Sequence, residues 1–183
     1  MKAAAPKNWN LRRFDVRAFA DAGARLEGTV ALAELDRLSE ECHPQGGPVA
    51  PVQWVVQGEL RLDASGRPAV WLRLEAHLDL PVTCQRCLGP VPVPLTVDRW
   101  FRFVDDEATA EAQDEISEED VLALEPRPDL LALMEDELLM ELPLVPMHTA
   151  CPEPLSGARE DAASGPDEPV RPNPFAALAK LRP

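Results

Sequence analysis

The sequence predicts an α+β fold: one domain, residues 10–150, built on an antiparallel meander sheet or a partly closed barrel with two helices. Three stretches in which apolar and polar residues alternate predict long strands, and two stretches with leucines at helical spacing predict the helices. Short turn sequences separate the strands, as expected when successive strands pair with each other. The 183 residues are enough for one packed core.

The two predicted helices lie at opposite ends of the domain. Residues 24–32 (ARLEGTVAL) predict a strand that runs into the first helix over residues 32–41, where leucines recur at every third position. The second helix covers residues 129–142. Asp129 is suited to accept hydrogen bonds from its first turn, and Pro143 ends it.

The long strands lie between these helices. Residues 51–66 and 67–82 predict a hairpin, because apolar and polar residues alternate on both sides of a turn sequence. Residues 91–106 continue the alternation and add a third strand. Proline cannot donate a hydrogen bond to a neighbouring strand, so Pro92 and Pro94 predict that this strand begins at an edge of the sheet.

The charge of the chain is strongly acidic and unevenly distributed. There are 32 acidic and 18 basic residues, for a net charge of -14. Residues 1–26 carry six bases and two acids, a net charge of +4, which leaves a net charge of -18 for the rest of the chain. Residues 1–9 are predicted to be a flexible basic arm. Residues 105–120 hold nine acids and no base, and this composition predicts a disordered loop or a weak helix. A field of this sign repels nucleic-acid phosphates and attracts basic proteins.

The end of the chain differs in composition from the domain. Residues 151–171 are rich in proline and poor in large apolar side chains, which predicts a linker. Residues 172–183 are predicted to be a short docking motif. Its Phe175, Leu178 and Leu181 share one potential helical face, with Asn173 as the cap.

Four residues have the spacing of a zinc site. Cys84 and Cys87 form one pair with two residues between them, and His148 and Cys151 form a second pair with the same gap. No apolar run predicts a signal peptide or a membrane span, so we expect a cytoplasmic protein without membrane association. Because cytoplasmic cysteines seldom form disulfides, the four residues are not expected to be a disulfide framework. Three cysteines and one histidine can close a structural zinc tetrahedron. Two alternatives remain open: the cysteines are ordinary turn residues, or they are a redox pair, although no helix follows to activate a thiol.

Catalytic motifs are missing from the sequence, which predicts that the protein is not an enzyme. There is no phosphate-binding loop, nucleophilic serine motif or HExxH motif. Glu135, Asp136 and Glu137 are consecutive in the second helix, so their side chains are expected to point apart and not to converge on one substrate atom. A metal-dependent hydrolase that uses the acidic residues is a weaker hypothesis.

Three blocks in the second half of the chain resemble the YceD family, the large ribosomal RNA subunit accumulation proteins. They are CQRCL at 84–88, MEDELLMELPLVPMH at 134–148 followed by Cys151, and PNPFAALAKL at 172–181. The first half is similar to the family only in its general order of strands and helices. The resemblance implies a cytoplasmic protein, with no established enzymatic activity, that supports synthesis, processing or stability of large-subunit ribosomal RNA.

The charge and the resemblance together predict a basic ribosomal protein or assembly factor as the partner, with ribosomal RNA contacted indirectly. The candidate partner-binding residues are Glu135, Asp136, Glu137, Asn173, Phe175, Leu178 and Leu181. The alternative is direct RNA binding by the basic arm and by aromatic and basic residues of the sheet, on which bases could stack: Trp54, Trp71, Arg73, Trp100 and Arg102.

Overall fold

The computed structural model describes residues 9–62, 66–117, 119–124 and 128–152. The chain divides into two compact units, Met1–Cys151 and Pro152–Pro183, and the fold described here is that of the first. Most of the predicted basic arm and nearly all of the predicted linker lie outside the described residues. The predicted docking motif, with Asn173, Phe175, Leu178 and Leu181, lies outside them entirely.

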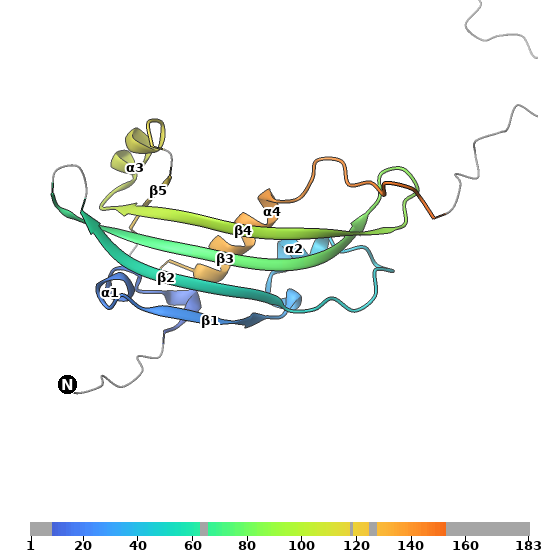
Figure 1. Cartoon of the computed structure of the whole chain (residues 1–183), viewed down its shortest axis with the longest axis horizontal. Coiled ribbons are helices and arrows are strands. Elements are labelled where there is room, and N and C mark those ends of the chain that lie inside the picture. The colour runs from blue at the N-terminus through green and yellow to red at the C-terminus, as the bar shows by residue number, and fades with distance from the viewer. Residues whose placement is uncertain (1–8, 63–65, 118, 125–127, 153–183) are drawn as a thin grey trace, which may run out of the picture. The chain divides into compact units, whose positions relative to one another are not determined.

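A five-stranded sheet in the order β1-β2-β3-β4-β5 forms the body of this unit (Figure 1). Successive strands from β1 to β4 pair antiparallel, which confirms the predicted hairpin and meander. β5 pairs parallel to the end of β4 and was not predicted. The prediction of a partly closed barrel is wrong, because β1 and β5 stand at opposite ends of the strand order. The strands are β1 (Arg25–Val30), β2 (Val52–Leu62), β3 (Pro68–Thr83), β4 (Pro90–Val104) and β5 (Asp120–Ala123).

Four α-helices occur among the described residues, two more than predicted. Both predicted helices are present: α2 (Asp36–Glu40) preceded by a short 3-10 turn, and α4 (Leu130–Met140), with Asp129 accepting hydrogen bonds from its first turn as expected. Of the other two, α1 (Val16–Asp21) was not predicted, whereas α3 (Glu107–Asp114) lies in the acidic run for which a weak helix was the alternative to a loop.

Helices α1, α2 and α4 cover one face of the curved sheet, and the core lies between them (Figure 1). Every second side chain of β3 from Val70 to Val82 is buried against this layer. The contact between α1 and β2 is close: a Cβ on Gly58 would lie 2.5 Å from Cδ1 of Phe19, so only glycine fits there. The largest fully buried side chains are Phe14, Phe19, Leu35, Leu38, Leu72, Leu74, Leu78, Leu80, Leu95, Phe101, Met134 and Leu138.

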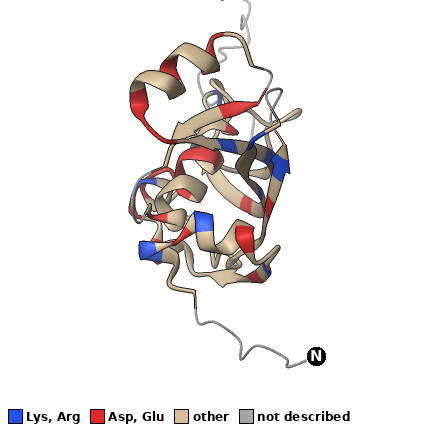
Figure 2. Ribbon diagram, turned by 90° about the vertical axis from the view of Figure 1, so that its left-hand side faces the viewer, with Lys and Arg blue, Asp and Glu red and all other residues tan. Residues whose placement is uncertain are grey.

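The acidic run 105–120 is more ordered than the predicted loop. Asp106 caps α3 by accepting a hydrogen bond from the Thr109 N–H, and Asp120 begins β5. Arg102 of β4 donates to Glu119 and to two further side chains of this segment, which ties the run to the sheet. No basic residue lies on α3, so its surface is acidic (Figure 2).

The prediction about the proline-containing edge is confirmed. β5 pairs only with Phe101–Val104, so within the described chain the earlier part of β4, with Pro92 and Pro94, has a strand neighbour on one side only. Proline in this part of β4 removes donors that would otherwise attract another strand.

Candidate metal centre

The first cysteine pair lies in the turn between β3 and β4. Cys84 comes directly after the end of β3, and two backbone hydrogen bonds of 2.9 Å close the turn: Cys84 N–H donates to the Gly89 carbonyl, and Leu88 N–H donates to the Cys84 carbonyl. Leu88, and not the neighbouring Gly89, takes the left-handed backbone conformation, with a φ of 60°. The turn points both sulfur atoms to the same side.

The second pair comes from the segment that follows α4. The Gln85 N–H donates to the Pro146 carbonyl at 2.8 Å, and this bond holds the segment against the cysteine turn. Nδ1 of His148 lies 3.5 Å from Sγ of Cys87, and the His148 N–H donates to Sγ of Cys84 at the same distance. Two segments more than 60 residues apart therefore meet at one point.

The four predicted ligands form one cluster. The ligand atoms of Cys84, Cys87, His148 and Cys151 all lie within 4.8 Å of one another. In a zinc tetrahedron with bonds of about 2.0–2.3 Å, ligand atoms are roughly 3.3–3.8 Å apart. The cluster therefore needs to contract by only about 1 Å to bind zinc. Its donor set, three sulfurs and one imidazole, is one that structural zinc prefers.

The local electrostatics favour a thiolate at this point. Burial alone would raise the pKa of the Cys84 thiol, but the surrounding N–H groups, first those of Cys87 and His148, lower it to about 5. Burial and the neighbouring sulfurs of Cys87 and Cys84 raise the pKa of Cys151 to about 11. Because sulfur binds zinc as the thiolate, a metal ion would reverse the unfavourable effect at Cys151.

His43 supports the cysteine turn through hydrogen bonds on both nitrogens of its ring. Its Nδ1 accepts a hydrogen bond from the Gln45 N–H, so Nε2 carries the proton and donates to the Leu88 carbonyl at 3.0 Å. This contact steadies the residue with the left-handed backbone. Cys42, in contrast, is not part of the metal-ligand cluster.

The three consecutive carboxylates of α4 do not meet at one atom. Glu135 and Glu137 are buried, and Glu135 and Asp136 accept hydrogen bonds from different nitrogens of the Arg37 guanidinium. Glu137 lies 3.1 Å from Nε of Arg99, without the alignment of a hydrogen bond. These contacts are internal to the chain, and a partner-binding role for the three carboxylates stays a prediction.

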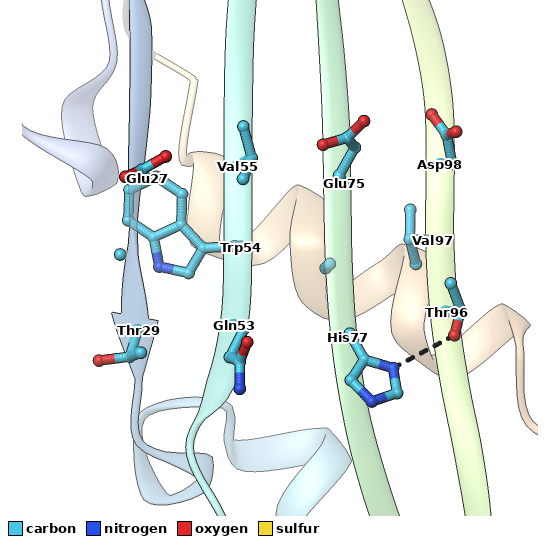
Figure 3. A pocket seen from close by; sticks show the side chains of 12 residues that line it. Glu27, Thr29, Gln53, Trp54, Val55, Glu75, His77, Thr96, Val97 and Asp98 are labelled. Atoms are coloured by element: carbon cyan, nitrogen blue, oxygen red, sulfur yellow. Dashed lines mark hydrogen bonds between the residues drawn. The ribbon is translucent and has the colours of Figure 1, made fainter.

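The face of the sheet opposite to α1, α2 and α4 is called the open face. Glu27, Val55, Glu75 and Asp98 form one cross-strand row of this face in register, and a second row contains His77, hydrogen-bonded to Thr96 (Figure 3). A shallow hollow of about 630 Å³ lies over these rows.

The sheet residues of the RNA-binding alternative separate in the structure. Trp54 is buried with 8% of its surface exposed, and its ring occupies the space beside Gly28. Arg73 is paired with Asp98 and Arg102 with Glu119. Trp71 and Trp100 are partly exposed on the open face.

Fold and site together define a two-layer α+β protein with a three-cysteine, one-histidine cluster of the kind that binds structural zinc. The family model described as "Large ribosomal RNA subunit accumulation protein YceD" matches residues 72–182. A curated protein of the same name from Haemophilus influenzae is 31% identical over 165 residues, which cover 88% of this chain and 91% of that protein. The chain belongs to the YceD family, and its similarity to the curated relative extends into the first half, beyond the blocks noted in the sequence. No solved structure is significantly similar to it.

Within the described ranges, no helix has both the length and the apolar character needed to cross a bilayer.

Proposed function

We propose that this chain is a cytoplasmic, non-enzymatic factor that supports the accumulation of large-subunit ribosomal RNA by binding a basic ribosomal protein or assembly factor. The observation that carries the proposal is membership of a family named for its effect on this RNA and not for a reaction. A structural zinc ion held by Cys84, Cys87, His148 and Cys151 is part of the proposal.

The surface charge supports a basic partner. The chain has a net charge of -14, and α3 exposes Glu107 and Glu111 with no base on the same helix. Charges on a binding surface act mainly on the rate of association, because they steer the partner before contact. Binding that depends on these carboxylates is therefore expected to weaken steeply with salt.

Direct RNA binding has less support than a protein partner. The two arginines named for RNA binding, Arg73 and Arg102, are already paired with carboxylates, and the ring of Trp54 is buried. An RNA strand on this face would bring phosphates close to Glu75 and Asp98, where like charges repel.

The proposal is tested by purifying the full chain from growing cells and identifying the proteins and RNAs that co-purify. We expect a basic ribosomal protein or assembly factor to be recovered at low salt and lost at high salt, with ribosomal RNA recovered only when that protein is present. The matched variants are Glu107, Glu111 and Glu115 changed to Gln, against a control with Glu34, Glu40 and Glu41 changed to Gln. All six side chains are exposed, so both variants lose the same charge.

The variant of α3 is expected to recover less partner than the control, because its carboxylates would steer the partner to its binding surface. Equal recovery from both variants would show that only net charge matters. If ribosomal RNA is recovered without any basic protein, and is still recovered after basic proteins are depleted from the lysate, then the direct RNA-binding alternative is favoured.

A further inference from the structure

Two tryptophans lie next to each other on the open face, near the beginning of β3. Trp71 of β3 and Trp100 of β4 meet edge to face, with ring centroids 6.3 Å apart. The guanidinium of Arg61, from the end of β2, lies 3.8 Å from the centre of the Trp100 ring and 4.5 Å from that of Trp71. The tryptophan pair therefore already holds the Arg61 guanidinium through cation–π contacts, and the Arg73 guanidinium lies farther off, 6.0 Å from the centre of the Trp100 ring.

The surroundings of the tryptophan pair are acidic. A hollow of about 700 Å³ borders the pair at the part of β4 that β5 does not cover. Four carboxylates line it: Asp98, Glu119, Asp120 and Glu141. The first three pair with Arg73, Arg102 and Arg99, whereas no such pair of Glu141 is found among the described residues. With Arg61 displaced from Glu59, these two glutamates leave the hollow acidic, so its charge complements an incoming cation.

We propose that the tryptophan pair and its acidic hollow bind an arginine side chain of a basic protein partner, in the position that Arg61 occupies in the free chain. The inference rests on the proposed function, which requires a basic partner, and it identifies the side chain that this partner inserts. Arg61 can be displaced because, among the described residues, its other contact is an ion pair with Glu59 in which both side chains are about one-third exposed (39% and 32%). Such pairs hold a side chain only weakly.

Arginine fits this site better than lysine or a nucleic acid does. A guanidinium is flat, is weakly hydrated and stacks on aromatic rings, whereas the ammonium of lysine is a compact and strongly hydrated charge. The carboxylate of Glu141 at the hollow can accept parallel hydrogen bonds from a guanidinium. The same carboxylate repels the phosphates of RNA, although the tryptophan rings alone could stack on bases.

The test uses the full chain and a labelled peptide in which Arg and Gly alternate, with fluorescence anisotropy at about 0.15 M salt. The reference peptide carries Lys in place of Arg. We expect the Arg peptide to bind more tightly than the Lys peptide, and Trp100→Leu to weaken Arg-peptide binding by about 3- to 10-fold, the range of a cation–π contact at a partly exposed site. Circular dichroism shows whether Trp100→Leu remains folded.

A second pair of variants keeps the inference testable if Trp100→Leu does not fold. Arg61→Gln empties the tryptophan pair, while Arg25→Gln removes the same charge from the open face on β1, where Arg25 pairs with Glu27. If Arg61 competes with the incoming side chain, Arg61→Gln strengthens Arg-peptide binding by about 3-fold or more relative to Arg25→Gln. Equal effects of the two variants, or equal affinity for the Arg and Lys peptides, would overturn the proposal.

Two outcomes separate this inference from the proposed function. If the peptide does not bind but a basic protein co-purifies with the full chain, then the partner uses another surface and the proposed function stands. If single-stranded oligouridine binds more tightly than the Arg peptide and loses affinity in Trp100→Leu, then the tryptophan pair is an RNA-stacking site, and the inference is wrong.

Discussion

Glu135 and Glu137 lie two residues apart on α4, both buried, and the structure predicts a large loss of stability when Glu135 is changed to glutamine but only a small change for Glu137. Oε1 of Glu135 accepts a hydrogen bond from the Leu38 N–H at 3.1 Å, and its Oε2 accepts two from Arg37. Since α2 has no side-chain cap of its own, this carboxylate satisfies a donor in the first turn of α2 from a distant part of the chain. Glu137 has one carboxylate oxygen that accepts no hydrogen bond within the described chain.

The expected magnitudes follow from these contacts. Glu135→Gln leaves only one acceptor oxygen for donors on both sides, and the loss of a charge-assisted hydrogen bond with a buried N–H costs about 1.5–3 kcal/mol. The ion pair with Arg37 adds little to the free energy of unfolding, because half of the Arg37 side chain is exposed (52%). Glu137→Gln removes a charge whose burial is poorly compensated, so the free energy of unfolding is expected to change by less than about 1 kcal/mol, in either direction.

The contributions of Glu135 and Glu137 to the free energy of unfolding change with pH in opposite directions. Burial opposes ionisation of Glu135, but the Leu38 N–H and Arg37 lower its pKa below the ordinary value of 4.5. Its contribution is therefore full above pH 4.5 and is lost as the pH falls through the lowered pKa. Burial raises the pKa of Glu137 above 4.5, so its destabilising effect is absent at lower pH and appears as the pH rises through the raised pKa.

Urea unfolding followed by circular dichroism, at one fixed zinc concentration and at several pH values, measures both effects. The gap between wild type and Glu135→Gln should narrow below pH 4.5, whereas Glu137→Gln should become relatively more stable as the pH rises. Equal losses in the two variants at neutral pH, or a larger loss in Glu137→Gln, would refute the reasoning from hydrogen bonds.

Two further predictions concern the metal and the end of the chain. Protein purified without a histidine tag should contain about one zinc per chain and melt at a lower temperature after chelation, and fewer than about 0.2 zinc per chain would exclude a zinc site. Deletion of residues 172–183 should leave the fold of residues 10–150 intact but reduce large-subunit RNA accumulation in cells that lack the native gene. Phe175→Ala should cause most of that loss, and Leu155→Ala in the predicted linker should cause none. Full activity of the protein that lacks residues 172–183 would show that the motif is dispensable.

The sequence was sufficient to predict the elements that have a strong pattern. The alternation in residues 67–82 predicts β3 because one face of that strand is buried and the other is open, so each residue type reports its environment. The cysteine and histidine cluster was predictable for a different reason: a ligand pair with a short gap marks a site even when its second pair lies far away in the sequence.

Other features were not predictable, because their cause is tertiary. α3 buries only Ala110, so its sequence has no apolar stripe, and its order depends on the Asp106 cap and on hydrogen bonds to Arg102. The burial of Glu135 follows from a backbone donor almost 100 residues away, which no local pattern reveals. The tryptophan pair likewise exists only through the register of β3 with β4, in which Trp100 is opposite Arg73 and one pair away from Trp71.

The positions of the two candidate sites indicate that they have separate tasks. The tryptophan pair lies near the beginning of β3 and Cys84 directly after its end, so the sites are about 40 Å apart along the strand, at roughly 3.3 Å per residue. At that separation, zinc cannot contact a side chain bound at the tryptophan pair. What zinc can do is join the β3–β4 turn to the segment after α4, which closes a loop of more than 60 residues and so fixes the helix layer against the sheet. A structural metal at one end would then keep in register the strands whose alignment creates the tryptophan pair at the other.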